Sequence, residues 1–467
     1  MKRIRFQHLS KTFKDAVEVV RALGLSYIWI DSLCIIQDND DDWKREAAKM
    51  SEVYREALCT ICALSSSDGD GGCRVNGSNE EMTHLRYVDL DLGEYRIRLV
   101  EANYPGDMET LNWDAEYGDE DFTYQPLGKS PLRVRAWAFQ ERELSVRAIH
   151  FSRHTLLWEC LEMKGSSEIP HSVSRHNYKS IPKPRQISPS DTGASGRDQW
   201  YGKVEDYTSR FLTYESDKFS AISRYAQHFR REMLSDGIYL AGLWKEHFPG
   251  CLLWMIKRET RVPGEKYPLP AIEPRRPTKY RAPTWSWASL DGEVTYRSQR
   301  VAYKSEIVVG TSPFSAYLLR YDVDLEESLF EVPTRASITM RGQITQVMLE
   351  HNLEAADDMS EYETELYRGL YDEAGDVIGV LYPDIMSEVQ DLRHVWCLGF
   401  CDEVEARVDR PPEIVYLSRD HDWLPQKMMG IALCAASDEC VFRRVGMVRW
   451  LDIFAFAGVG LSEVKIV

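Results

Sequence analysis

The pattern of apolar residues near the start of the chain predicts a helix followed by a strand. Apolar side chains recur at helical spacing over residues 12–23, and Gly24 follows as a stop signal. Residues 25–30, LSYIWI, are apolar without regular alternation, which is typical of a strand buried on both faces in a parallel sheet. Helical spacing returns over residues 47–57, and residues 58–64 predict a second buried strand. Together these elements predict a strand–helix–strand unit.

The rest of the chain divides by pattern into further regions. Residues 163–198 are polar and form the best linker candidate, which places a first domain at residues 1–162. Residues 199–292 are predicted to be helical, including an aromatic-rich stretch at 239–256. Residues 293–467 are predicted to be a mixed, β-rich and acidic C-terminal region. The predicted fold class is α/β, with a parallel sheet core at the N-terminus followed by helical and β-rich regions.

Composition and charge limit the classes of function. The chain has 467 residues, and its net charge of −17 disfavours binding to the phosphate backbone of nucleic acids. Most of this negative charge lies beyond residue 350. No apolar run approaches the roughly 18 residues that span a bilayer, and the first residues lack the apolar core of a signal peptide. We therefore expect a soluble, cytoplasmic protein with no membrane span and no nucleic-acid partner.

Polar residues follow the first predicted strand. Asp31, Ser32 and Cys34 come directly after residues 25–30, and the carboxyl ends of parallel strands border the ligand crevice of an open sheet. Asp31 is therefore a candidate catalytic residue, and Ser32 and Cys34 are candidate substrate-binding residues. The alternative is that Asp31 only caps or hydrogen-bonds the turn that follows it.

Glu46 is the second candidate catalytic residue. Its spacing from Met50, Val53 and Ala57 places the carboxylate on the apolar face of the predicted helix. Partial desolvation there would raise its pKa, which suits a general acid or base, whereas the helix N-terminus would lower it. The alternative is a carboxylate that only stabilises the helix dipole.

Familiar metal and nucleotide motifs are missing from the sequence. Cys59 and Cys62 form a CxxC, but no second pair follows at zinc spacing. The acidic run at residues 38–42 lacks the glycine and glutamate that an EF-hand requires. No glycine-rich phosphate loop and no GxSxG motif occurs, which disfavours a conventional NTPase, Rossmann dehydrogenase or α/β-hydrolase. We expect no metal site.

Five sequence blocks together resemble one known family. Two of them resemble the core of the fungal heterokaryon-incompatibility (HET) domain. They are LGLSYIWIDSLCIIQDNDDDWKREAAKMSEVYREALCTICALSSSDGDGGC at 23–73 and RAWAFQERELSVRAIHFSRHTLLWEC at 135–160. The other three blocks are similar to the region that commonly follows this domain. They are WYGKVEDYTSRFLTYESDKFSAISRYA at 200–226, YLAGLWKEHFPGCLLW at 239–254 and RAPTWSWASLDG at 281–292.

The resemblance implies a role in fungal vegetative incompatibility, in which HET domains trigger regulated cell death after non-self recognition. It also implies a TIR-like, flavodoxin-like fold, and some TIR relatives hydrolyse NAD through a glutamate on a helix. By position, Glu46 in WKRE is the candidate for that glutamate, and Asp31 in WIDSLC would line the pocket. NAD is then the candidate substrate, with no certain cofactor. The AWAFQER block adds candidate substrate-binding residues: Trp137, Gln140, Glu141 and Arg142.

The resemblance also sets an expectation for the start of the chain. HET domains usually open with a strand resembling LSYCWG some tens of residues before the helix predicted at 12–23. The sequence is therefore expected to be an N-terminally shortened or a diverged member of the family.

Two other interpretations keep the fold and change the function. In the first, the chain is a non-catalytic interaction module whose aromatic and acidic surfaces bind protein partners, with a homo-oligomer as one such assembly. In the second, it is a repurposed enzyme of secondary metabolism whose aromatic-rich crevice binds an apolar small molecule. Clusters such as Trp285 and Trp287 belong more often to a core than to a ligand cage.

Overall fold

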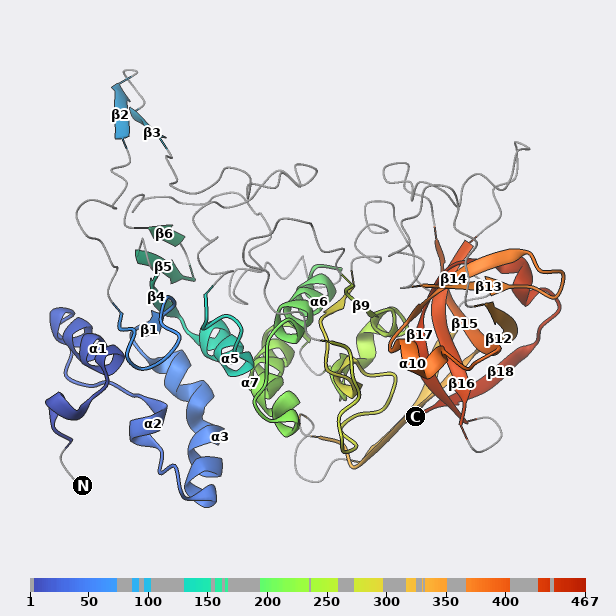
Figure 1. Ribbon diagram of the computed structural model, residues 1–467, viewed down its shortest axis with the longest axis horizontal. Coiled ribbons are helices and arrows are strands. Elements are labelled where there is room, and N and C mark those ends of the chain that lie inside the picture. Colours follow the sequence, from blue (N-terminus) through green and yellow to red (C-terminus); the bar gives the residue numbers. More distant parts are fainter. Residues whose placement is uncertain are drawn as a thin grey trace. The chain divides into compact units, whose positions relative to one another are not determined.

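A computed structural model of the chain divides into two compact units (Figure 1). Unit 1 comprises residues 1–187 and 261–269, and unit 2 comprises residues 188–260 and 270–467. The predicted linker at 163–198 lies mostly outside the described residues, and the predicted domain boundaries stay a prediction. The structure describes residues 4–73, 86–91, 96–101, 130–152, 156–161, 164–166, 194–234, 237–258, 273–296, 316–324, 330, 332–350, 367–403, 427–436 and 441–467.

The helices of unit 1 begin and end at local capping signals. In α1 (Lys11–Ala22), the Ser10 hydroxyl accepts a hydrogen bond from a backbone N–H of the first turn. Gly24, with φ of 73°, lets the chain leave the helix in a left-handed conformation. In α3 (Asp40–Glu56), the Asn39 side chain caps the N-terminus in the same way. Both helices confirm the predicted spacing. Among its described residues, unit 1 also contains η1 (Phe6–His8), α2 (Asp31–Cys34) and α5 (Ala136–Leu144).

The main sheet of unit 1 is small and mixed. Its strand order is β1-β4-β5-β6, and only β1 and β4 run parallel. β1 confirms the strand predicted within residues 58–64, but a flavodoxin-like parallel core is not confirmed. The strands are β1 (Thr60–Ala63), β4 (Arg147–Phe151), β5 (Leu156–Cys160) and β6 (Lys164–Ser166), with β2 (Arg86–Asp91) and β3 (Arg96–Glu101) as a separate antiparallel pair.

Residues 25–30 do not form the predicted strand, so this part of the prediction is wrong. Within the described part of the chain they pair with no strand, and none of the six residues is buried. A strand requires a neighbour that accepts and donates its backbone hydrogen bonds, and an apolar run by itself does not supply one.

Unit 2 contains an eight-stranded sheet that closes on itself. Six strands follow one another in the order β12-β13-β14-β17-β16-β15, and β15 pairs back to β12, while β11 and β18 extend the sheet (Figure 1). Every pairing is antiparallel except β17 with β18, which confirms a β-rich C-terminal region. The strands are β11 (Tyr317–Asp324), β12 (Arg335–Glu350), β13 (Arg368–Tyr371), β14 (Val377–Pro383), β15 (His394–Glu403), β16 (Lys427–Ala435), β17 (Val441–Asp452) and β18 (Leu461–Ile466), with the short helices α10 (Met386–Val389) and η12 (Ile453–Phe456) between them.

The other part of unit 2 is helical at first, as predicted, and then irregular. α6 (Ala194–Thr208) and α7 (Ser220–Phe229) lead into residues 239–256, where the predicted helix is wrong. Ala241 and Gly242 have positive φ angles of 45° and 96°, which no α-helix accommodates. Short elements replace the helix: η6 (Glu215–Lys218), the π-helical turn η7 (Arg230–Leu234), β7 (Tyr239–Leu240), β8 (Leu243–Trp244), η8 (Lys245–His247), η9 (Gly250–Leu252), β9 (Met255–Ile256), η10 (Trp287–Ser289) and β10 (Val294–Thr295).

Arg444, the base of a fully buried ion pair with Asp384, joins these two parts of unit 2. Arg444 of β17 donates to both carboxylate oxygens of Asp384, with distances of 3.0 Å from Nε and 3.0 Å from Nη2. Its guanidinium carbon lies 3.5 Å from the centroid of the Trp254 ring, and it also donates to the carbonyl oxygens of Leu252 and Trp254. The closed sheet is thereby fixed to the aromatic segment at residues 252–254.

Removing the Asp384 carboxylate should destabilise unit 2 strongly. Asp384→Ala leaves the Arg444 charge buried without its partner, which costs about 3–5 kcal/mol of unfolding free energy. Denaturant unfolding of the full chain measures the loss. The matched control is Glu293→Ala, because the Glu293–Lys257 pair is partly exposed and should contribute about 1 kcal/mol or less. Equal losses in the two variants would contradict the prediction.

Candidate functional site

Tyr54 of α3 lies at the centre of a group of polar side chains in unit 1. Burial raises the pKa of Tyr54, and the nearby carboxylates of Glu141 and Asp31 raise it further, as does a hydrogen bond with Glu141. The Trp29 ring contacts the Tyr54 ring edge-on, with 5.8 Å between the centroids. The fold thus brings together two predicted residues, Asp31 and Glu141, from segments far apart in the sequence.

The surroundings of Asp31 support both of the roles considered for it. Its Oδ1 accepts a hydrogen bond from the backbone N–H of Ser32 at 2.6 Å, which is the local role in the turn. Asp31 is also exposed, so a ligand can reach it, and its charge acts on Tyr54. Ser32 and Cys34 are exposed on the same short helix, α2, and their part in substrate binding stays a prediction.

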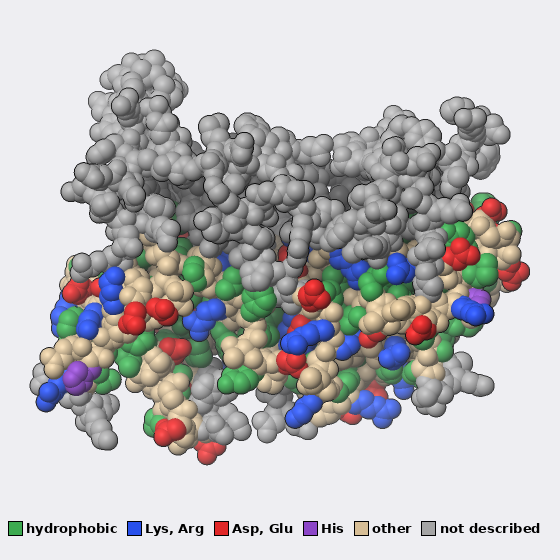
Figure 2. All heavy atoms as spheres, viewed as in Figure 1, with side chains coloured by type: hydrophobic (Ala, Val, Ile, Leu, Met, Phe, Trp, Pro, Cys, Tyr) green, Lys and Arg blue, Asp and Glu red, His purple; other side chains and the backbone are tan. Residues whose placement is uncertain are grey.

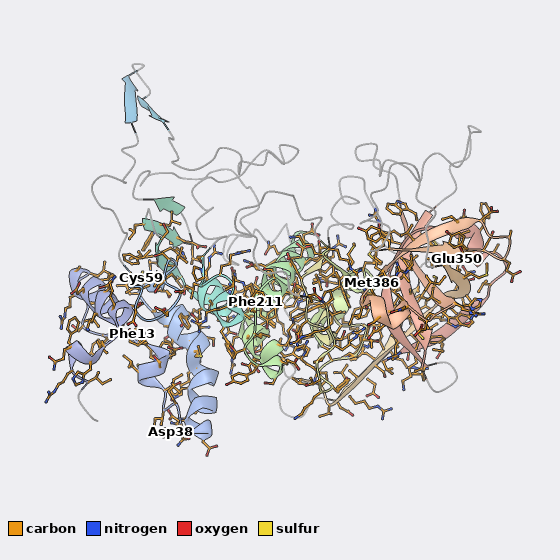
Figure 3. All side chains as sticks on the ribbon, viewed as in Figure 1. Phe13, Asp38, Cys59, Phe211, Glu350 and Met386 are labelled. Atoms are coloured by element: carbon orange, nitrogen blue, oxygen red, sulfur yellow. The ribbon has the colours of Figure 1, made fainter. Side chains whose placement is uncertain are left out.

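Glu46 lies apart from the Tyr54 group on the same helix. Glu46 lies eight positions before Tyr54, which is about 12 Å along a helix axis. Asp38 and Cys59, labelled in Figure 3, lie just before and just after α3. Glu46 belongs to the N-terminal half of the helix. Its carboxylate pairs with Lys49 at 3.0 Å and with Arg45 at 3.4 Å. The hydrogen bond with Lys49 lowers the pKa of Glu46, opposite in direction to the shift that suits a general acid. Its catalytic role stays a prediction.

Arg142 of α5 joins this helix to the mixed sheet. Its Nε and Nη2 atoms lie 3.1 and 3.3 Å from the two carboxylate oxygens of Glu159 on β5. His150 on β4 contacts the same carboxylate, with 3.2 Å between Nε2 and Oε2. Glu159 and His150 are buried, so this network fixes α5, and with it Glu141, relative to the sheet.

The other two residues proposed from the AWAFQER block differ in exposure. Trp137 is half-buried on α5, whereas Gln140 is only 2% exposed. A bound substrate could reach Trp137 without rearrangement of the helix, but Gln140 points into the interior. Binding roles for Trp137, Gln140 and Arg142 stay predictions.

Burial raises the pKa of three thiols of unit 1, Cys59, Cys62 and Cys73. Cys62 on β1 is the register neighbour of His150 on β4, and burial raises its pKa to about 12. The carboxylates of Glu141 and Glu159 also act to raise the pKa of Cys62, so it is a poor nucleophile in this setting. Among the residues that the structure describes, no group of three or more His, Cys, Asp or Glu could hold a metal ion.

Tyr54, His150 and Glu159 were not proposed from the sequence as parts of an active site. Tyr54 could have been found, because it lies four residues after Met50 and eight after Glu46, on one face of the helix. Glu159 had no comparable signal, since its contact with Arg142 depends on how α5 meets β5.

The aromatic blocks of unit 2 form a core instead of a crevice. Trp200, Trp244, Trp285 and Trp287 are completely buried and lie among other rings. A groove of about 560 Å³ on the same unit is lined mainly by charged and hydroxyl side chains, among them Arg320. These features do not favour an apolar small molecule as ligand.

Residues 1–141 match the family model described as heterokaryon incompatibility protein (HET). The chain carries a HET domain. The matched range contains the whole Tyr54 group, since it includes both Asp31 and Glu141. Neither the curated proteins nor the solved structures contain a significant match to the chain.

The charge and hydropathy of the described residues are relevant to two possible partners, membranes and nucleic acids. In the part of the chain that is described, no helix is long and apolar enough to cross a membrane. Figure 2 shows one face, on which acidic and basic side chains are interspersed across the described surface. The expectation that the protein does not bind nucleic acid stays a prediction.

Replacing Glu141 should lower the pKa of Tyr54. Glu141→Gln removes one of the negative charges that disfavour the tyrosinate, so the phenol should titrate at a lower pH than in the native HET domain. NMR of ring-labelled tyrosine at neutral pH measures the chemical shift of the Tyr54 Cζ atom, which depends on the hydrogen bond and charge at residue 141, and Tyr54→Phe assigns the signal. The control is Glu52→Gln, an exposed position on the same helix, which should leave that chemical shift unchanged. An unchanged Tyr54 signal in Glu141→Gln would refute the proposed contact.

Proposed function

We propose that this protein acts in fungal vegetative incompatibility, where its HET domain triggers regulated cell death in the cytoplasm after non-self recognition. The match of residues 1–141 to the HET family supports this role. The parallel pair of β1 and β4 supports the finer proposal that the domain is related to the TIR fold. The trigger would then be a change in a protein partner.

We further propose that the Tyr54 group cleaves NAD. Breaking the bond between nicotinamide and ribose leaves positive charge on the ribose ring, and carboxylates placed beside that ring stabilise such a cation. Nicotinamide leaves with the electron pair of the broken bond, and water then adds to the ribose and loses a proton to a carboxylate. Glu141 and Asp31 would supply the negative charges.

The observation that carries this proposal is that two carboxylates, Glu141 and Asp31, act on one half-buried phenol. Tyr54 is protonated at neutral pH, so it can donate a hydrogen bond to Glu141 and hold that carboxylate in one orientation. Asp31 is exposed and Glu141 is half-buried, so a ligand can reach both from solvent. Glu46, held by Lys49 and Arg45, is the second candidate for the catalytic carboxylate.

Nicotinamide release from NAD by the purified full chain tests the enzymatic proposal. We expect turnover by the native protein, and a loss of about 100-fold or more in Glu141→Gln, since removing a charge that acts on the transition state costs this much. Asp31→Asn should also lower the rate.

Two further variants make the outcome specific. Glu52→Gln changes an exposed glutamate on α3 and should keep full activity. Loss of activity in Glu46→Gln with full activity in Glu141→Gln would move the site to the N-terminal half of α3. A native protein without turnover at high concentration would refute NAD cleavage and leave the family assignment in place.

A second candidate function is that of a non-catalytic interaction module. The exposed apolar side chains of residues 25–30 favour it, because a soluble surface rarely presents such a run without a partner. Expression in a fungus distinguishes the two: an interaction module should cause cell death only when its partner is present, and Glu141→Gln should not change the result.

A further inference from the structure

The groove of about 560 Å³ on unit 2 lies over strand β12. This strand pairs with β18 on one side (Figure 1) and with β11 on the other. Ser337 and Thr339 are two positions apart on β12, so they point to the same face of the sheet and form the floor of the groove. Charged side chains of the two flanking strands form its walls: Arg320 and Asp322 of β11, and Glu463 and Lys465 of β18.

The hydroxyl groups on the floor are buried without a partner among the residues that the structure describes. Ser337 is 6% exposed and Thr339 is 8% exposed. Neither side-chain oxygen takes part in a hydrogen bond with those residues. Because buried polar groups in folded proteins normally have a partner, the two hydroxyls indicate that polar atoms of a ligand or of water occupy the groove.

The four charged side chains of the walls are unequally paired. Arg320 and Glu463 form an ion pair with each other across β12, so their charges largely cancel. Neither Asp322 nor Lys465 forms an ion pair with a residue that the structure describes. One carboxylate and one ammonium group therefore remain for a ligand, on opposite sides of the floor.

The strand register sets the separation of these two charges. Asp322 is opposite Ser337, whereas Lys465 is opposite Thr339, two residues further along β12. Two strand spacings of about 4.8 Å and two residues of about 3.4 Å each place the Cα atoms of Asp322 and Lys465 about 12 Å apart. A single α-amino acid carries its two charges one carbon atom apart and is too short for both partners, whereas three residues of extended chain span about 10 Å.

We propose that this groove binds a short peptide in its zwitterionic form, with the carboxylate of the peptide on Lys465 and its ammonium group on Asp322. The hydroxyls of Ser337 and Thr339 hydrogen-bond with the N–H and C=O groups of the peptide, since a hydroxyl both donates and accepts. A ligand that carries only negative charge leaves Asp322 unpaired and is repelled by it. All of these residues belong to unit 2, and the inference does not depend on NAD cleavage.

Titration of the full chain with triglycine, followed by amide NMR, tests the proposal. We expect saturable binding with a Kd in the millimolar range, because each exposed ion pair contributes about 1 kcal/mol or less. The largest chemical-shift changes should occur at amides of residues 320–322, 337–339 and 463–465. Acetylating the N-terminus of triglycine removes its ammonium group, and amidating the C-terminus removes its carboxylate. Each change should raise the Kd about fivefold.

Charge variants of the protein identify which wall residue meets which end of the peptide. Lys465→Met and Asp322→Asn should each raise the Kd for triglycine about fivefold. Lys465→Met should have no further effect on the amidated peptide, and Asp322→Asn none on the acetylated one, because the matching charge is already absent. The control is Lys257→Met, which changes an exposed lysine of unit 2 outside the groove and should bind triglycine as the native protein does.

Several outcomes would overturn the proposal. A native chain that does not bind triglycine would do so, as would chemical-shift changes confined to other parts of the protein. Equal affinity for the acetylated peptide would indicate a site for anions alone, and equal affinity for the amidated peptide a site for cations alone. Asp322 is exposed, so Asp322→Asn should fold normally, and native affinity in that variant would also contradict the proposal.

Discussion

The buried contact between Arg444 and Asp384 is the constraint on which the architecture of unit 2 depends. Moving both charges out of water costs several kcal/mol per ion, and only a complete set of hydrogen bonds offsets that cost. Arg444 has such a set, because its guanidinium also meets the carbonyls of Leu252 and Trp254, and its backbone N–H donates to Thr284 Oγ1 at 3.0 Å. A shift of the sheet against the aromatic segment would break several of these bonds together, so one geometry is strongly preferred.

Unit 1 is held by a smaller network that also forms its candidate site. Arg142, Glu159 and His150 fix α5 to the sheet. Glu141, which directly precedes Arg142, hydrogen-bonds with Tyr54 of α3. The same contacts therefore position α5 and present a carboxylate beside Asp31. In this unit, stability and the proposed chemistry rest on neighbouring side chains of a single helix.

Local signals explain which elements could be predicted from the sequence. α1 and α3 have regular apolar spacing and side-chain caps within the first turn, so nearby residues in the sequence identify the type of element and where it begins. Residues 25–30 and 239–256 are apolar without a regular period. In these two segments the secondary structure depends on which other residues pack against them. In the second stretch, side chains such as Trp244 and Trp254 are buried on all sides, which removes the amphipathic pattern of a surface helix. The candidate site follows the same division. The sequence shows that Glu46 and Tyr54 lie on one face of a helix. It does not show that Glu46 pairs with Lys49, which depends on side-chain geometry, or that Tyr54 contacts Glu141, which depends on tertiary packing.

The segment at residues 25–30 and the proposed site are joined by the chain itself. Residues 25–30 lead directly into Asp31, and the carbonyl of Ile30 begins the short helix α2 by accepting the amides of Leu33 and Cys34. Trp29 packs on Tyr54, so both ends of this junction contact the Tyr54 group. Asp31 is thus held locally by α2, whose first turn includes the hydrogen bond from the Ser32 amide to the Asp31 carboxylate. The Trp29–Tyr54 contact joins that turn to α3, so the distance between the Asp31 charge and the Tyr54 phenol is set by a short stretch of chain that packs on one ring. A change that removes the Trp29 ring should therefore act on Asp31 and Tyr54 together.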